Sequence, residues 1–126
     1  MGTLVISKKE NEKYKYTYNN WKGNTIVTSN SLQTKAHCIS EINVLKRNFS
    51  SIEFLKYKTP SGKLYFKLTI NGHVVAVSRK FTTPLLMEKG MNDIMKNFNQ
   101  SEILDFTEDI FENFPEDIFN EIDNNI

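Results

Sequence analysis

Hydrophobic and polar residues alternate in two separate parts of the chain, and each alternation leads into a turn. Apolar side chains occupy every second position of residues 64–70, which predicts a half-buried strand. Asn71-Gly72 follows and predicts a tight hairpin into a strand over residues 74–78, because both central positions of a type I′ turn need positive φ. Residues 14–18 and 25–29 repeat this arrangement around a looser turn.

A helix is predicted to follow each hairpin. Thr83 is a suitable N-cap, and Pro84 suits the first helical position, where its missing N–H costs nothing. One apolar stripe then recurs at helical spacing: Met87, Met91, Ile94 and Phe98. The first half of the chain has a matching cap, Thr34, and a matching stripe: Cys38, Ile42, Leu45 and Phe49. Gly90 interrupts the second helix, which predicts that this helix approaches the sheet closely there.

Two further strands complete the pattern. Residues 52–58 alternate loosely and end at the strong turn signal Thr59-Pro60-Ser61-Gly62. Residues 102–106 align with the stretch that begins at Glu53, so we expect a short strand there as well.

These matching patterns come from an internal duplication. Residues 4–55 align with residues 54–104 at an offset of 50, which falls to 49 after a one-residue slip near Asn20. The identities include Gly23 with Gly72, Ser29 with Ser78, Thr34 with Thr83, and Asn48 with Asn97. Two copies are too few for a stacked solenoid. We therefore predict one domain over residues 1–106, made of a first repeat (3–51) and a second repeat (52–106) that complete one another.

Length and composition agree with one small domain. The chain has 126 residues, of which 39% are hydrophobic, and this is enough to build a core. The single cysteine, Cys38, excludes an internal disulfide and requires no oxidising compartment. Residues 1–6 have neither a basic start nor a cleavage site, so they do not resemble a signal peptide, and no apolar run is long enough for a membrane span. We expect a cytoplasmic protein with no membrane partner.

The net charge of +1 conceals a division along the chain. Residues 101–126 hold nine acidic residues and no Lys or Arg, which leaves 16 basic and six acidic residues in 1–100, a net charge of +10. Such asymmetry is typical of nucleic-acid binding or of an interacting tail. The alternative is that the two parts neutralise each other within the fold.

Residues 107–126 are predicted to form an acidic, amphipathic, helical tail. The apolar side chains on which an interaction would depend are Phe111, Phe114, Ile118, Phe119 and Ile122. This segment is too hydrophobic for a plain solubility tail, so we expect it to pack on something. That could be the basic part of the same chain, a second copy, or another protein.

The residues that carry catalytic or metal chemistry elsewhere do not converge in this sequence. His37 and Cys38 are adjacent on a helix, so their side chains point about 100° apart and cannot hold one ion. Cys38 also lies on the apolar stripe, where a buried small side chain is the expected role. No glycine-rich phosphate loop is present. We therefore predict a non-enzymatic protein with no cofactor, no metal and no catalytic residue.

A binding surface is the better-supported hypothesis. If the strands turn their apolar side chains toward the helices, the opposite sheet face presents Lys15, Thr17, Lys63, Tyr65 and Lys67. Basic residues with an exposed aromatic ring suit single-stranded nucleic acid, because the charges follow phosphates and the ring stacks on a base. The alternative is an ordinary solvated face. Of the two functions, we place a small interaction or self-assembly module ahead of a nucleic-acid-binding module.

The second repeat resembles the YegP-like family, small bacterial proteins of unknown function. The similarity rests on the run from Asn71 to Ser78, on Phe81-Thr82-Thr83, and on the helix ending Ile94 to Asn97. The first repeat matches at fewer positions, and Leu32 replaces an aromatic residue. The resemblance implies an α+β fold, in which tandem β-β-β-α(-β) units form one antiparallel sheet with exchanged terminal strands and two helices on one face. It implies no activity.

Overall fold

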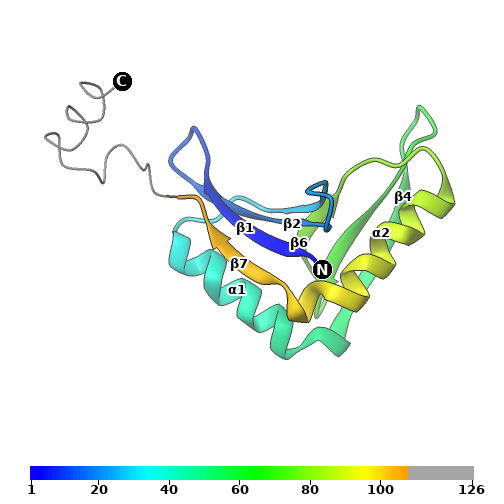
Figure 1. Cartoon of the computed structure of the whole chain (residues 1–126). Coiled ribbons are helices and arrows are strands. Elements are labelled where there is room, and N and C mark those ends of the chain that lie inside the picture. The colour runs from blue at the N-terminus through cyan, green and yellow to red at the C-terminus, as the bar shows by residue number, and fades with distance from the viewer. Residues whose placement is uncertain (108–126) are drawn as a thin grey trace, which may run out of the picture.

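A run of three strands and a helix occurs twice along the chain and is followed by one last strand (Figure 1). This computed structural model describes residues 1–107. The first half contains β1 (Thr3–Lys8), β2 (Tyr14–Asn19), β3 (Thr25–Ser29), α1 (Lys35–Arg47) and the short 3-10 turn η1 (Phe49–Ser51). The second half contains β4 (Ile52–Lys58), β5 (Leu64–Ile70), β6 (His73–Ser78), α2 (Pro84–Asn97), η2 (Phe98–Gln100) and β7 (Glu102–Asp105).

Turn and cap residues set these boundaries as the sequence predicts. Asn71 and Gly72 have φ angles of 50° and 81°, the positive values that the tight turn between β5 and β6 requires. The Thr34 hydroxyl accepts a hydrogen bond from the His37 N–H, and the Thr83 hydroxyl accepts one from the Leu86 N–H. Each bond satisfies an amide at a helix start that has no partner within the helix.

The seven strands in residues 1–107 belong to one mixed sheet, in the order β4-β5-β6-β3-β2-β1-β7. The two halves meet at the centre, where β3 and β6 pair antiparallel. The expected exchange of a terminal strand is present, because β7 leaves the second half and pairs with β1 of the first. The expectation of a purely antiparallel sheet is wrong at this edge, since β1 and β7 are parallel. β7 reaches β1 through the α2 crossover rather than through a hairpin, and a crossover permits parallel pairing.

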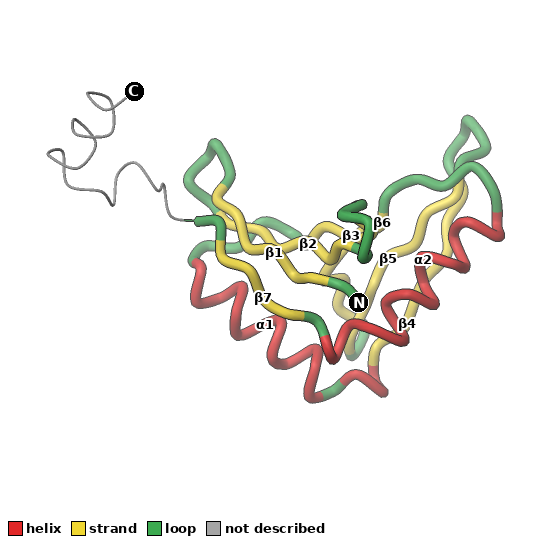
Figure 2. The backbone as a smooth tube through the Cα atoms, viewed as in Figure 1, coloured by secondary structure: helices red, strands yellow, loops and turns green. Residues whose placement is uncertain are grey.

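Both helices lie on one face of the sheet, as expected, and the other face is open (Figure 2). The helix face holds the largest fully buried side chains, including Tyr16, Tyr18 and Phe66. The predicted stripes supply most of the helix contribution to the core, with Ile42 and Ile94 both completely buried. The β1–β2 and β4–β5 ends of the sheet rise on either side of the open face (Figure 1).

Some expectations fall beyond the described residues. The acidic tail is described only at Thr107, and Phe111, Phe114, Ile118, Phe119 and Ile122 lie outside. The division into repeats over 3–51 and 52–106 stays a prediction. Neither helix in residues 1–107 combines the length and the apolar character needed to cross a membrane.

Replacing Ile94 by Ala tests the packing of α2 on the sheet. Ile94 is 0% exposed, so we expect the free energy of unfolding to fall by about 2–5 kcal/mol, measured by urea denaturation. The adjacent Met95 is 57% exposed on the same helix, and Met95→Ala is the matched control, with an expected change below about 0.5 kcal/mol. Equal effects of the two substitutions would contradict this packing.

Candidate functional site

The five residues of the predicted binding face lie where the strand alternation places them. Lys15 and Thr17 belong to β2, Tyr65 and Lys67 belong to β5, and Lys63 is exposed just before β5. Their neighbours Tyr16 and Phe66 are buried against the helices, so these side chains take the open face.

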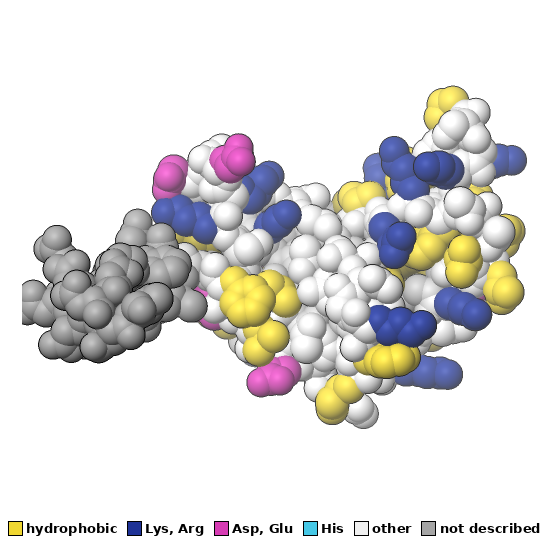
Figure 3. All heavy atoms as spheres, turned by 45° about the horizontal axis from the view of Figure 1, so that its top comes forward, with side chains coloured by type: hydrophobic (Ala, Val, Ile, Leu, Met, Phe, Trp, Pro, Cys, Tyr) yellow, Lys and Arg dark blue, Asp and Glu magenta, His cyan; other side chains and the backbone are white. Residues whose placement is uncertain are grey.

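The structure does not gather these residues into one patch. Thr17 is opposite Thr28, Thr28 is opposite Val77, and Val77 is opposite Lys67. The β2 and β5 residues therefore stand three strand spacings apart, about 14 Å. Figure 3 shows Lys and Arg side chains with hydrophobic ones between them on the half built by the second part of the chain. Acidic side chains in this view lie on the other half.

Tyr57, which sequence reasoning missed, completes a cluster on the β4–β5 half. Its ring stacks on that of Tyr65, with centroids 5.3 Å apart and planes 17° apart. Lys67 Nζ lies 4.9 Å from the centroid of the Tyr57 ring, a cation–π distance. We call Tyr57, Tyr65 and Lys67 the tyrosine–lysine cluster. The signal was present in the sequence, because a hairpin turn at residues 59–62 puts Tyr57 opposite Tyr65.

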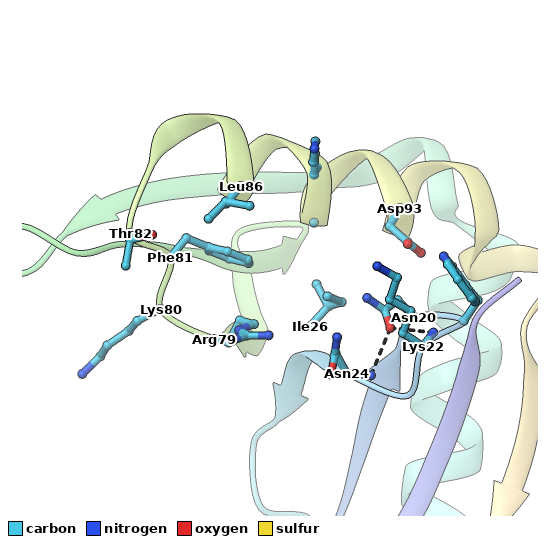
Figure 4. Close-up of a pocket in the computed structure, with 13 residues that line it drawn as sticks. Asn20, Lys22, Asn24, Ile26, Arg79, Lys80, Phe81, Thr82, Leu86 and Asp93 are labelled. Carbon is cyan, nitrogen blue, oxygen red and sulfur yellow. Dashed lines mark hydrogen bonds between the residues drawn. The ribbon is translucent and has the colours of Figure 1, made fainter.

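A second candidate site lies on the helix face, between the β2–β3 turn and α2 (Figure 4). We call it the cationic groove, and its volume is about 450 Å³. Basic side chains line it from three segments: Lys22 of the turn, Arg79 and Lys80 after β6, and Lys89 of α2. Ile26, Phe81, Leu86 and Gly90 supply its apolar lining.

Gly90 explains why the groove has an apolar floor. A Cβ atom at this position would lie 3.0 Å from Phe81 Cζ and 3.4 Å from Ile26 Cγ2. The absent side chain therefore lets the Phe81 ring and Ile26 approach the α2 backbone. This confirms the close approach that the mid-helix glycine predicts.

The walls of the groove differ in character. Trp21 is 71% exposed on the turn, and Lys22 Nζ lies 5.3 Å from the centroid of its ring. The Asn20 side chain fixes the turn by accepting hydrogen bonds from the Lys22 and Asn24 amides (Figure 4). Arg79 lies over the Phe81 ring at 5.9 Å, while Lys80 points away from the groove centre (Figure 4). The groove thus combines an exposed indole, an apolar floor and a basic rim.

The positive charge of the groove is not cancelled within residues 1–107. The ion pairs found there are Lys8–Glu12 and Lys35–Asp105, each at 2.8 Å, and neither involves a groove residue. One carboxylate, that of Asp93, lines the groove. It already accepts hydrogen bonds from the Tyr18 hydroxyl and from Asn97 Nδ2. An anionic group entering the groove would therefore meet cations without carboxylate partners.

The alignment of the two halves of the sequence provides an internal comparison for this charge. At the 49-residue offset, Arg79 and Lys80 correspond to Asn30 and Ser31. Lys89 and Gly90 correspond to Ser40 and Glu41. The positions of the first half that correspond to these residues are therefore neutral or acidic, so this part of the basic rim does not follow from the fold.

Two tyrosines of β2 connect the sheet to both helices. The Tyr16 hydroxyl donates a hydrogen bond to the Glu41 carboxylate of α1, and the Tyr18 hydroxyl donates one to the Asp93 carboxylate of α2. Burial is the main cause that raises the pKa of each phenol above its ordinary value of 10.0, and the neighbouring carboxylate raises it further. Both groups are therefore hydrogen-bond donors that hold the fold.

Residues with catalytic or ligating chemistry are dispersed. Burial raises the pKa of the Cys38 thiol to about 11, so this thiol stays protonated and unreactive. His37 is exposed on α1 and His73 is exposed at the start of β6. Residues 1–107 contain no group of three or more His, Cys, Asp or Glu side chains placed to hold a metal ion.

Comparisons with known proteins support the predicted resemblance. The chain is 26% identical to a UPF0339 protein of Shewanella oneidensis over 109 residues, covering 84% of this chain and 98% of that one. It is 27% identical to the UPF0339 protein YegP of Shigella flexneri over 108 residues, with the same coverage of 84% and 98%. No family model matches the chain.

Two solved structures share the fold. The solution NMR structure of a UPF0339 protein from Shewanella oneidensis has a TM-score of 0.75 at 20% identity, covering 90% of this chain and 98% of that one. The solution NMR structure of YegP from Escherichia coli, described as a protein of unknown function, has a TM-score of 0.72 at 21% identity, covering 86% and 95%. The resemblance to YegP-like proteins of unknown function and the α+β fold are confirmed.

Alkaline pH should destabilise the protein through its buried tyrosines. Folding raises the pKa of Tyr16, so its contribution to stability is complete below pH 10 and is lost as the pH rises above 10, where unfolded tyrosine ionises. Relative to Tyr16→Phe, the wild type should lose up to about 1.4 kcal/mol per pH unit above pH 10. Urea unfolding of both proteins between about pH 8 and pH 11 measures this difference. Parallel stability curves would show that the Tyr16 phenol is not held protonated by the fold.

Proposed function

We propose that the protein is a non-enzymatic, cytoplasmic interaction module whose cationic groove binds an acidic polypeptide segment that carries aromatic side chains. The single observation that carries this proposal is the basic rim over an apolar floor, where the positions that correspond to Arg79, Lys80 and Lys89 in the other half are not basic. Trp21, Lys22, Arg79 and Lys89 supply the exposed ring and the cations, and Ile26 and Phe81 supply the floor.

The chemistry of the groove favours this ligand class. Its volume of about 450 Å³ has room for one or two large apolar side chains, which would gain from contact with the floor. Carboxylates flanking those side chains would reach the rim, where opposite charges increase both the association rate and the specificity. A purely apolar ligand would leave the basic side chains unused, and a small inorganic anion would leave the floor uncovered.

The chain's own residues 108–126 have the composition of such a ligand. They contain seven acidic residues, no basic residue, and the apolar side chains Phe111, Phe114, Ile118, Phe119 and Ile122. We propose this segment as the first ligand to test, acting within its own chain or on a second copy. Because Trp21 is the only tryptophan and lines the groove, its fluorescence reports occupancy directly.

A synthetic peptide of residues 108–126 should bind a protein that ends at Thr107, and the change in Trp21 fluorescence should saturate. The double variant Arg79→Glu/Lys89→Glu of that protein should bind about tenfold or more weakly, because each reversal turns an attraction into a repulsion. Lys13→Glu/Arg47→Glu is the matched control, since it changes the net charge equally at exposed sites outside the groove. Equal weakening by both double variants would show that the effect comes from the net charge of the protein and not from the groove. An absence of saturable binding would refute the proposal.

A second function, single-stranded nucleic-acid binding on the open face, is favoured by the tyrosine–lysine cluster. Tyr57 is 37% exposed, and a base that stacks on such a ring gains about 1–3 kcal/mol. Lys67 of β5 lies over the Tyr57 ring and Lys63 is exposed just before β5, so both could contact phosphates, and Lys15 continues the positive charge on β2. The acidic segment would compete with nucleic acid for the basic part of the chain.

A labelled single-stranded oligonucleotide tests this second function at about 100 mM salt. The protein that ends at Thr107 should bind it with a dissociation constant below about 100 μM, and the affinity should fall as salt rises. Tyr57→Ala should weaken binding about tenfold, whereas replacing Tyr14, a partly buried tyrosine outside the cluster, by Ala should not. Weaker binding that is insensitive to salt would exclude this function and leave the peptide-binding proposal untouched.

A further inference from the structure

The two edges of the sheet are not equivalent, although the strands next to them correspond. β1 of the first half and β4 of the second align at the 50-residue offset, and each pairs antiparallel with the strand that follows it. β7 covers the outer side of β1. Nothing in residues 1–107 pairs with the outer side of β4, which is the longer of the two edge strands.

Backbone hydrogen bonds show which groups of β4 face outward. The Thr59 amide donates to the Lys63 carbonyl, and the Glu53 carbonyl accepts from the Thr69 hydroxyl, so odd-numbered residues of β4 face β5. The amides and carbonyls of the even-numbered residues, such as Phe54 and Lys56, therefore face outward. At the other edge, Ile6 corresponds to Lys56, and its outward carbonyl accepts a hydrogen bond from the Phe106 amide.

The side chains of β4 also lack the cover that their counterparts have. Leu4 is 0% exposed beside β7, whereas the corresponding Phe54 is only partly buried. On the open face, Leu55 is 41% exposed and Tyr57 is 37% exposed. A hollow of about 380 Å³, lined by Lys58, Leu64 and Met87 among others, lies between β4 and the start of α2. An uncovered strand with apolar side chains on both faces is an assembly edge.

We propose that this edge joins two copies of the chain, with β4 pairing antiparallel to β4 of the second copy about a two-fold axis at Leu55. The interface is separate from the cationic groove and goes beyond the function proposed above. In this register Leu55 meets Leu55 of the second copy, and Tyr57 meets Glu53. On the helix face, Phe54 is opposite Lys56 of the second copy and Ile52 is opposite Lys58.

Self-complementarity is the reason to choose a second copy as the partner. The proposed register pairs outward residues with outward residues, so each outward amide and carbonyl of β4 has a partner, as an antiparallel ladder requires. It also places no like charges directly opposite one another. Moving the axis to Lys56 would place two lysines face to face, which is unfavourable. The two lysines of β4, which elsewhere protect an edge, here exclude the register centred at Lys56.

Cysteine cross-linking at the axis tests the proposal on the full chain. Leu55 and its copy form a non-hydrogen-bonded pair with Cα atoms about 4.5 Å apart, which lies within the range of a disulfide. Leu55→Cys should therefore become a disulfide-linked dimer under mild oxidation, seen on a non-reducing gel. The native Cys38 is 0% exposed and should not interfere. Leu104→Cys is the matched control, because Leu104 lies on the same face at the opposite edge, and it should form no disulfide-linked dimer on the same gel.

Sedimentation of the unmodified chain gives an independent readout. At about 100 μM protein, which populates a dimer with a low-micromolar dissociation constant, the native chain and Leu104→Lys should sediment as dimers. Leu55→Lys should sediment as a monomer, because two like charges would meet at the axis. A monomeric native chain, or equal cross-linking of the two cysteine variants, would overturn the proposal. Failure of the peptide to bind the groove would leave this result unaffected.

Discussion

The short antiparallel pairing of β3 with β6 is the constraint on which the rest of the structure depends. It joins the two halves of the sheet through only three residue pairs: Val27 with Ser78, Thr28 with Val77, and Ser29 with Ala76. Two of these residues, Ser29 and Ser78, also lie at the ends of the neighbouring β2–β3 and β5–β6 strand pairings. Ser29 Oγ accepts the Tyr16 amide, and Ser78 Oγ accepts the Phe66 amide, each at 2.9 Å. Both serines are buried, so loss of either oxygen would leave a buried amide without a partner. After each serine the chain leaves the sheet and enters a helix, which sends both helices over the same face.

That arrangement makes the fold depend on its last strand. β7 covers the outer edge of β1, and α1 holds it there from the helix face. Lys46 Nζ donates to the Ser101 carbonyl, and Lys35 Nζ lies 2.8 Å from Asp105 Oδ2. The hydrogen bond from Lys35 is the main cause that lowers the pKa of the Asp105 carboxyl to about 2. Residues 1–107 contain only one strand of this kind, so within them a sheet built from two similar halves has one covered edge and one open edge. The asymmetry follows from the number of strands and needs no special residue at β4.

Signals within short stretches of the sequence were sufficient to predict the helices and strands. They did not predict how strands far apart in the sequence pair. The Asn71-Gly72 turn, the Thr34 and Thr83 caps and the two apolar stripes each depend on a few neighbouring residues, and all were predicted. The exchange of a terminal strand was expected from the family resemblance, but the parallel direction of β7 beside β1 was missed, because the pattern of residues 102–105 carries no information about strand direction. The cationic groove was missed for a related reason. Its residues come from the β2–β3 turn, the segment after β6, and α2, and only the central pairing of β3 with β6 brings them together. The mid-helix Gly90 indicated close packing, but the sequence did not show which side chains would lie against it.

The differences between the two aligned halves indicate where this fold has room for function. At the position of Gly90, the first half has Glu41, whose carboxylate accepts the Tyr16 hydroxyl and ties α1 to β2. In the second half the equivalent tie is made three residues later, by Asp93 to Tyr18 of the same strand. β2 therefore anchors both helices, while the corresponding residues of β5, Phe66 and Leu68, have no hydroxyl groups to offer. Moving the carboxylate from the position of Gly90 to that of Asp93 leaves the middle of α2 without a side chain over Phe81. The absent side chain at Gly90 leaves the Phe81 ring against the α2 backbone as the floor of the groove, and basic side chains surround that floor.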